Sequence, residues 1–185
     1  LAAWRGGWAD AVLMRTADGM LSLPALPLLV VLAAVDTGRF GLPRGEALSD
    51  IARITVILVV FGWIGVARLA RAAALRELTQ DYVAAARVAG ATEARVLLRH
   101  VLPNIVGPIT VATALAVAGA ILAESTLSFL GLGIQPPASS WGNMLSNAQE
   151  MVFSAPLVAV WPGLAILLAV AGCTLTADGL RQRGA

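Results

Sequence analysis

Few side chains in this chain combine the chemistry and the placement that catalysis would need. The sequence holds one histidine, His100, and one cysteine, Cys173, which is too few for a zinc site of the usual kind. Only two charged residues, Arg53 and Glu124, stand close to the long apolar segments, and both lie near a segment end. No nucleophile elbow, phosphate-binding loop or metal-ligand spacing occurs. The sequence therefore disfavours an integral membrane enzyme, and it indicates no cofactor.

The composition requires a solvent other than water. Hydrophobic residues make up 58% of the 185 residues and charged residues 13%, whereas a soluble domain carries about 25% charged residues. The mean hydropathy is +0.82. So little polar surface cannot cover a water-soluble globule of this size, and a bilayer accepts the surplus apolar surface. We expect a membrane protein with lipid as its main surroundings and no nucleic-acid partner.

The apolar segments predict an all-α, polytopic membrane helical bundle. Four complete spans are expected, at residues 19–35, 51–67, 105–123 and 156–177. In the first of them, Pro24 and Pro27 predict a kink or a late helix start, because proline removes a backbone hydrogen bond. Residues 1–20 are expected to be the end of a fifth span followed by a short loop. Residues 36–50 and 124–155 are expected to be loops, because Gly, Pro and polar residues gather there.

The arginines predict the orientation of these spans. With four spans, ten arginines fall on one side of the membrane and three on the other. The larger group comprises Arg5, Arg15, Arg68, Arg71, Arg76, Arg87, Arg95, Arg99, Arg181 and Arg183, and the smaller group comprises Arg39, Arg44 and Arg53. The positive-inside rule places the larger group in the cytosol. Residues 81–104 are therefore predicted to be cytosolic, and residues 124–155 to lie outside.

The polar segment at residues 81–104, called the platform below, is too long for a simple turn. Its alanines favour a helix, which Gly90 is expected to stop or bend. A second helix is expected to start near Thr92, with Glu93 in its first turn, where an acidic residue suits the helix dipole. Pro103 is expected to end this helix and begin the next. A face of small residues would let a partner protein approach closely; an amphipathic helix lying on lipid is the alternative.

The platform resembles the cytosolic signature loop of permease subunits of bacterial ATP-binding-cassette importers. That signature reads Glu-Ala-Ala, three residues, Gly, nine residues, Ile, any residue, Leu-Pro. The matching residues here are Ala85, Ala86, Gly90, Leu102 and Pro103. The sequence departs from the signature twice, with Ala84 in place of the Glu and His100 in place of the Ile. The form RHVLPN is similar to the dipeptide/oligopeptide branch of the family.

The resemblance extends over nearly the whole chain. The blocks that carry it are GGWADAVLMRTAD (6–18), LSLPALPLL (21–29), GWIGVARLAR (62–71), ESTLSFLGLGIQPPASSWGNML (124–145), WPGLAILLAV (161–170) and ADGLR (177–181). It implies the type I importer permease fold, in a multi-pass protein of the bacterial plasma (inner) membrane. It also implies that residues 1–185 form a single transmembrane domain, incomplete at its N-terminus, with residues 77–104 as a cytosolic coupling loop.

The resemblance also implies a function and a set of partners. The chain would form the translocation pathway for dipeptides or oligopeptides, without enzymatic activity of its own. ATP would be bound and hydrolysed by two cytosolic ABC ATPase subunits. A second permease subunit would complete a heterodimer, and an extracytoplasmic solute-binding protein would deliver the solute. Nickel or another solute of the same branch remains an alternative substrate, and an ion-coupled secondary transporter or an inactive fragment remains an alternative of another class.

Two groups of residues are candidates for these functions. The residues expected to couple to the ATPase are Tyr82, Val83, Ala84, Ala85, Ala86, Arg87, Gly90, Ala91, His100, Leu102 and Pro103. The candidates for the pathway or an outer gate are Glu124, Ser128 and Trp141. Glu124 lies nineteen residues beyond Ile105, roughly 28 Å along a helix, so a loop-anchoring role near the outer boundary is favoured over a substrate contact. Trp141 is expected to pack the outer mouth, and contact with the binding protein is the alternative.

Overall fold

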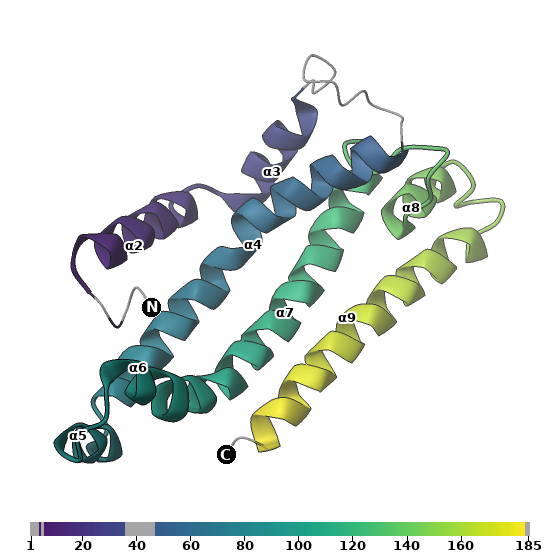
Figure 1. Cartoon of the computed structure of the whole chain (residues 1–185). Helices are drawn as coiled ribbons and strands as arrows, with labels where there is room; N and C mark the ends of the chain where they lie inside the picture. The colour runs from purple at the N-terminus through teal and green to yellow at the C-terminus, as the bar shows by residue number, and fades with distance from the viewer. Residues whose placement is uncertain (1–3, 5, 36–46, 184–185) are drawn as a thin grey trace. The chain divides into compact units, whose positions relative to one another are not determined.

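The structure is a computed structural model that describes residues 4, 6–35 and 47–183. Over these residues it contains helices and no strand, which confirms the predicted all-α class. In chain order the helices are α2 (Gly7–Leu21), α3 (Ala25–Ala34), α4 (Ala47–Leu78), α5 (Asp81–Val88), α6 (Glu93–Val96), the π-helical segment η2 (Leu97–Val101), α7 (Leu102–Phe129), α8 (Trp141–Gln149) and α9 (Leu157–Arg183) (Figure 1).

The contacts between residues divide the chain into two compact units. Unit 1 comprises residues 1–22, 63–116 and 175–185, and unit 2 comprises residues 23–62 and 117–174. The long helices α4, α7 and α9 each contribute residues to both units. The platform belongs to unit 1, and the segment that follows α7 belongs to unit 2.

Three helical stretches in the described part of the chain are long and apolar enough to cross a membrane. They are Leu48–Leu78, Glu93–Phe129 and Leu157–Gln182, and they cover the predicted spans at 51–67, 105–123 and 156–177 to within one residue. The pair α2 and α3 adds a fourth candidate if the two helices, bent by 87° at their junction, are taken as one span. The multi-pass architecture predicted from the apolar segments is confirmed.

The prediction for residues 1–35 is wrong in its details. Residues 19–35 do not form one straight span, because α2 continues to Leu21 and α3 is a separate helix of ten residues that begins at Ala25. Pro24 directly precedes α3 with φ −66°, the angle that its ring imposes. The predicted late helix start is therefore correct. The loop predicted within residues 1–20 is instead helix α2 from Gly7 onward.

The acidic residues of α2 form ion pairs with α4. Asp10 accepts two hydrogen bonds from Arg71 Nε, at 2.9 and 3.1 Å, and one from Arg71 Nη2 at 2.7 Å. Asp18 pairs more loosely with Arg68, at 3.6 Å. Both arginines belong to α4, so these acidic residues meet basic partners within unit 1. Charges that are paired in this way can occupy a helix packed against an apolar neighbour.

The two pairs differ in exposure, which predicts different effects of neutralising each acid. The Asp10 side chain is 12% exposed and that of Asp18 is 58% exposed. We expect Asp10→Asn to lower the unfolding temperature in detergent, because it leaves the Arg71 guanidinium without its charged partner in a partly dry site. The matched variant Asp18→Asn should leave the unfolding temperature nearly unchanged, because exposed pairs contribute little. Equal effects of the two variants would contradict this assignment.

Two predicted loops are shorter than expected. Of the loop predicted at residues 36–50, residues 47–50 belong to helix α4, and residues 36–46 lie outside the described residues. The loop predicted at 124–155 is largely helical, since α7 extends to Phe129 and α8 covers Trp141–Gln149. The Ser140 hydroxyl caps α8 by accepting a hydrogen bond from the Asn143 N–H at 3.2 Å, a local signal that the sequence does contain.

Each unit has its own small hydrophobic core. In unit 1 the core consists of Val83, Val96, Val101 and Ile105. In unit 2 it consists of Leu29, Ala33, Ile54 and Leu127. Much of the remaining apolar surface is exposed in the described chain, as expected for helices that face lipid or partner subunits.

Candidate functional site

The platform begins with helix α5, which ends as its sequence predicts. The Gly90 N–H donates to Arg87 O at 3.0 Å, and the Ala91 N–H donates to Ala86 O at 3.0 Å. These two bonds form a Schellman motif, which needs a residue in the left-handed conformation. Gly90 supplies it with φ +81°. The chain reverses there, and α6 begins at Glu93 after Thr92, so the two predicted short helices are present.

The second platform helix passes into α7 without a break. α6 is followed by the π-helical turn η2, and α7 starts at Leu102 with Pro103 as its second residue. Proline lacks an N–H, and its ring crowds the carbonyl four residues earlier. A widened turn immediately before Pro103 accommodates both effects. Pro103 therefore does begin the next helix, but the preceding helix does not stop in front of it as predicted.

Apolar packing fixes α5 on the rest of the platform. Val83 is fully buried and packs with Val96, Val101 and Ile105. Ala86 and Ala91 are half-buried against the same cluster. A side chain of α5 thus fills a core that α6, η2 and α7 build. α5 is thus attached to the start of α7 through close-packed side chains, which have low compressibility.

Tyr82 makes a polar connection between three helices. Its hydroxyl donates to the Glu77 carboxylate on α4 and accepts from Asn104 Nδ2 on α7 at 3.0 Å. The hydrogen bond with Glu77 raises the pKa of the Tyr82 phenol, so the hydroxyl keeps its proton and remains a donor. Asn104 also donates to His100 O at 2.7 Å, and the His100 ring lies 6.3 Å from that of Tyr82. α5 is therefore joined to α4 as well as to α7.

An ion pair spans the turn at Gly90. Arg87 donates to Glu93 through Nε at 3.0 Å and through Nη2 at 3.3 Å. The Trp4 indole N–H donates to the same carboxylate at 3.0 Å. Because Arg87 and Glu93 are both about half exposed, the pair adds little stability. Its effect is to orient the end of α5 relative to the start of α6.

The predicted coupling residues divide by exposure. Those that are exposed are Tyr82, Ala84, Ala85, Arg87, Gly90, Leu102 and Pro103; Ala86, Ala91 and His100 are half-buried, and Val83 is buried. Val88, which the sequence analysis did not select, is 91% exposed. An apolar side chain so exposed next to Ala84 and Ala85 extends the small-residue face of α5. The exposed face of α5 is therefore small and apolar at these three positions.

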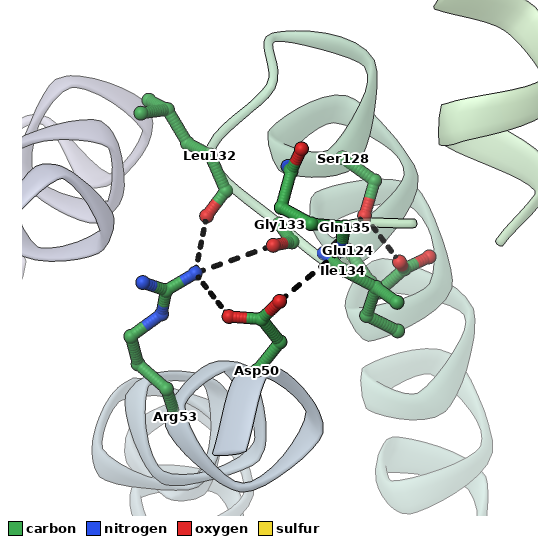
Figure 2. A network of polar contacts seen from close by, with 8 residues as sticks. All are labelled: Asp50, Arg53, Glu124, Ser128, Leu132, Gly133, Ile134 and Gln135. Carbon is green, nitrogen blue, oxygen red and sulfur yellow. Dashed lines mark hydrogen bonds and ion pairs between the residues drawn. The ribbon is translucent and has the colours of Figure 1, made fainter. Parts of the chain in front are cut away.

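The second group of predicted residues lies in unit 2. Glu124 and Ser128 belong to the last turns of α7, where the Ser128 hydroxyl donates to Glu124 Oε1 at 2.6 Å and accepts from the Ile134 N–H at 3.0 Å (Figure 2). Glu124 thereby orients the Ser128 hydroxyl, and this hydroxyl binds the backbone of the segment that follows α7. This geometry is that of a loop anchor. Trp141 is the first residue of α8, and the residue is 38% exposed.

The same network contains residues that the sequence analysis did not select as a site. Arg53 Nη2 donates to Leu132 O and to Gly133 O, both at 3.2 Å, and pairs with Asp50 Oδ1 at 3.3 Å. Asp50 Oδ2 accepts from the Gln135 N–H at 3.3 Å. The i,i+3 spacing of Asp50 and Arg53 at the start of a span is a sequence signal for such a pair. In the described residues, no group of three or more His, Cys, Asp or Glu side chains is placed to hold a metal ion.

Comparisons with known proteins identify relatives over almost the whole chain. The dipeptide transport system permease protein DppC of Escherichia coli K12 is 42% identical over 171 residues, which is 92% of this chain and 53% of that protein. The di/tripeptide transport system permease protein DppC of Pseudomonas aeruginosa is 41% identical over 182 residues, 98% of this chain and 56% of that protein. A putative peptide transport system permease protein of Brucella suis is 38% identical, with 98% and 57% covered.

This chain spans about half the length of the curated relatives it matches. A family described as the binding-protein-dependent transport system inner membrane component matches residues 1–183. That description confirms the resemblance drawn from the platform signature, and it is the description of a transport component rather than an enzyme. Together with the membrane-crossing helices, it confirms the predicted location in the bacterial inner membrane. The chain therefore belongs to the family of binding-protein-dependent transport system inner membrane components.

Proposed function

We propose that this chain acts in the permease subunit of an importer that carries dipeptides and oligopeptides across the bacterial inner membrane. The relatives are named as dipeptide, di/tripeptide and peptide transport permeases, which supports the substrate class. Two cytosolic ATPase subunits bind and hydrolyse ATP, and the permease itself needs no cofactor. An external solute-binding protein delivers the solute, and a second permease subunit completes a heterodimer.

The observation that carries this proposal is the construction of the platform. Its exposed face consists of small and apolar side chains on α5, at Ala84, Ala85 and Val88. Behind that face, Val83 and Tyr82 join α5 to α7 and α4. A short helix that is accessible on one side and rigidly attached on the other suits the transfer of motion from a partner. ATP-driven movement of the ATPases would thus rock the attached helices, as alternating access requires.

The predicted coupling residues differ in solvent exposure, and we infer a different role for the exposed and the buried ones. Ala84 and Ala85 contact the ATPase, whereas Ala86 and Val83 face the core of the platform and position α5. Ala84, at the position where the family signature has glutamate, offers no charge, so the contact at this position is one of shape. Arg87 is engaged by Glu93 and acts mainly in setting the angle between the two short helices. Leu102 and Pro103 begin α7 and receive the motion.

Uptake by the assembled transporter in proteoliposomes tests the proposal. The permease pair, the ATPases and a loaded binding protein are reconstituted, and import of a labelled dipeptide is measured with internal or external ATP and with or without an imposed ion gradient. We expect import that requires ATP on the ATPase side and is unaffected by collapse of the gradient. Import driven by the gradient without ATP would show a secondary transporter instead. ATP-driven import of nickel, with no dipeptide import, would refute the substrate class.

A further inference from the structure

The turn at residues 132–135 forms a polar bridge between two helices of unit 2. Its amide groups on one side bond to α7: the Leu132 N–H and the Gly133 N–H donate to Leu127 O at 2.8 and 3.0 Å, and the Ile134 N–H donates to Ser128 Oγ at 3.0 Å. On the other side, the Leu132 and Gly133 carbonyls and the Gln135 N–H bond to Arg53 and Asp50 of α4 (Figure 2). Both helix ends therefore share one short piece of backbone.

The α4 side of the bridge is built from buried charge. The side chain of Asp50 is 1% exposed and that of Arg53 is 5% exposed. One nitrogen, Arg53 Nη2, contacts two carbonyl oxygens and the Asp50 carboxylate. A buried ion pair gains little net stability over well-packed apolar side chains, but it admits few alternative geometries. Its contribution here is to fix one position of the 132–135 turn relative to α4.

Close backbone packing fixes the α7 side equally firmly. A Cβ atom on Gly133 would overlap the Ser128 side chain and lie 2.6 Å from Ser128 Cα. A Cβ atom on Gly142, in the first turn of α8, would overlap Ser125 O and lie 2.9 Å from Ser125 Cα. The turn and α8 thus pack against the last turns of α7 at backbone distance. Movement of the end of α7 must carry the turn with it.

We propose that Asp50 and Arg53 are positioning residues that make the first turns of α4 and the last turns of α7 move together during transport. This inference rests on the proposed function, since it assigns to the pair a part in the alternating access of that permease. When the helices rock, the contacts of Asp50 and Arg53 with the 132–135 turn transmit displacement of the end of α7 to the start of α4. Without these contacts, the ATPases still hydrolyse ATP, but the two helix ends separate and less solute is imported for each ATP hydrolysed.

The assembled transporter, carrying Asp50→Asn, Arg53→Gln or both, tests this role. Asp50→Asn keeps one oxygen that can accept from the Gln135 N–H, and it replaces the charged oxygen that pairs with Arg53 by an NH2 group, so it is the milder variant if Arg53→Gln assembles poorly. Arg68→Gln is the matched control, because Arg68 also lies on α4 but forms an exposed pair. The first readout is hydrogen exchange of the amides in the 132–135 turn. We expect exchange about tenfold faster or more in the Arg53 variant, as loss of a bond to a charged group implies, and unchanged in the control.

The second readout is the number of dipeptides imported per ATP hydrolysed, which a mere loss of folded protein would not alter. We expect this ratio to fall about fivefold or more in either single variant, the lower end of coupling between sites. The double variant should be no worse than the more affected single variant, because paired residues act as a unit. An unchanged ratio, or additive effects, would overturn the inference. If the unmodified transporter imports no dipeptide with ATP, it is the proposed function that fails.

Discussion

Replacing Gly90 by tryptophan is expected to leave the transporter assembled and hydrolysing ATP, but to reduce import per ATP about tenfold or more, within the usual range of coupling between sites. Two features of the structure at Gly90 underlie this prediction. Gly90 has φ +81°, and a Cβ atom there would meet nothing within 4 Å in the described chain. We therefore expect the substitution to act through the conformation of the turn and through bulk presented to the partner, because the first added atom meets no neighbour among the described residues.

Three replacements separate these two effects. Alanine adds little bulk but strains the left-handed turn by about 1–2 kcal/mol. Asparagine adds more bulk and tolerates that conformation. Tryptophan combines strain with bulk. If docking depends on close approach, import per ATP should fall in the order alanine, asparagine, tryptophan; if only the turn matters, alanine should be worse than asparagine. A tryptophan variant that imports normally would rule out Gly90 as part of the docking surface.

Replacing Gly142 by alanine is expected to have the largest effect on the stability of unit 2. The added Cβ atom would overlap the Ser125 carbonyl oxygen and lie 2.8 Å from its carbon. These are backbone atoms within a helix, so neither can rotate away, and α8 must shift off α7. Overpacking of this kind costs about 1–3 kcal/mol. The measurement is the unfolding temperature in detergent, together with proteolysis near α8.

Gly119→Ala provides the control for this substitution. Gly119 lies within α7, and a Cβ atom there would meet nothing within 4 Å. Alanine is the better helix former by about 1 kcal/mol, so this variant should be as stable as the unmodified protein or slightly more stable. If Gly142→Ala unfolded at the same temperature as Gly119→Ala, the close contact between α8 and α7 would be wrong.

Local signals made the platform predictable from the sequence. Gly90 indicates the end of one helix, Thr92 the start of the next, and Glu93 its first turn. In the structure α5 ends before Gly90, Thr92 is the N-cap of α6, and Glu93 is in its first turn. The positions of the long apolar helices follow equally directly from hydropathy. Such features are determined by residues that are adjacent in the sequence, so they can be predicted from the sequence alone.

Features that depend on distant partners were missed. In α2, Asp10 pairs with a residue 61 positions away, and no local feature of the sequence indicates that partner. Arg53 bonds to backbone carbonyls of Leu132 and Gly133, and a carbonyl partner leaves no trace in residue type. The local sequence signal for the short helix α8 is its N-cap residue, Ser140. Tertiary contacts supply what local propensity lacks in each case.

The most direct test of the central claim is the side of the membrane on which Ala85 lies. A single cysteine is placed at position 85 by Ala85→Cys in a Cys173→Ser background, and a membrane-impermeant maleimide is applied to intact spheroplasts and to inside-out vesicles. Ser139→Cys, at an exposed residue beyond the 132–135 turn, is the matched position expected on the outside. We expect position 85 to be labelled only in inside-out vesicles and position 139 only in spheroplasts. Labelling of position 85 from outside intact spheroplasts would contradict a cytosolic platform, and with it the proposed docking of the ATPase.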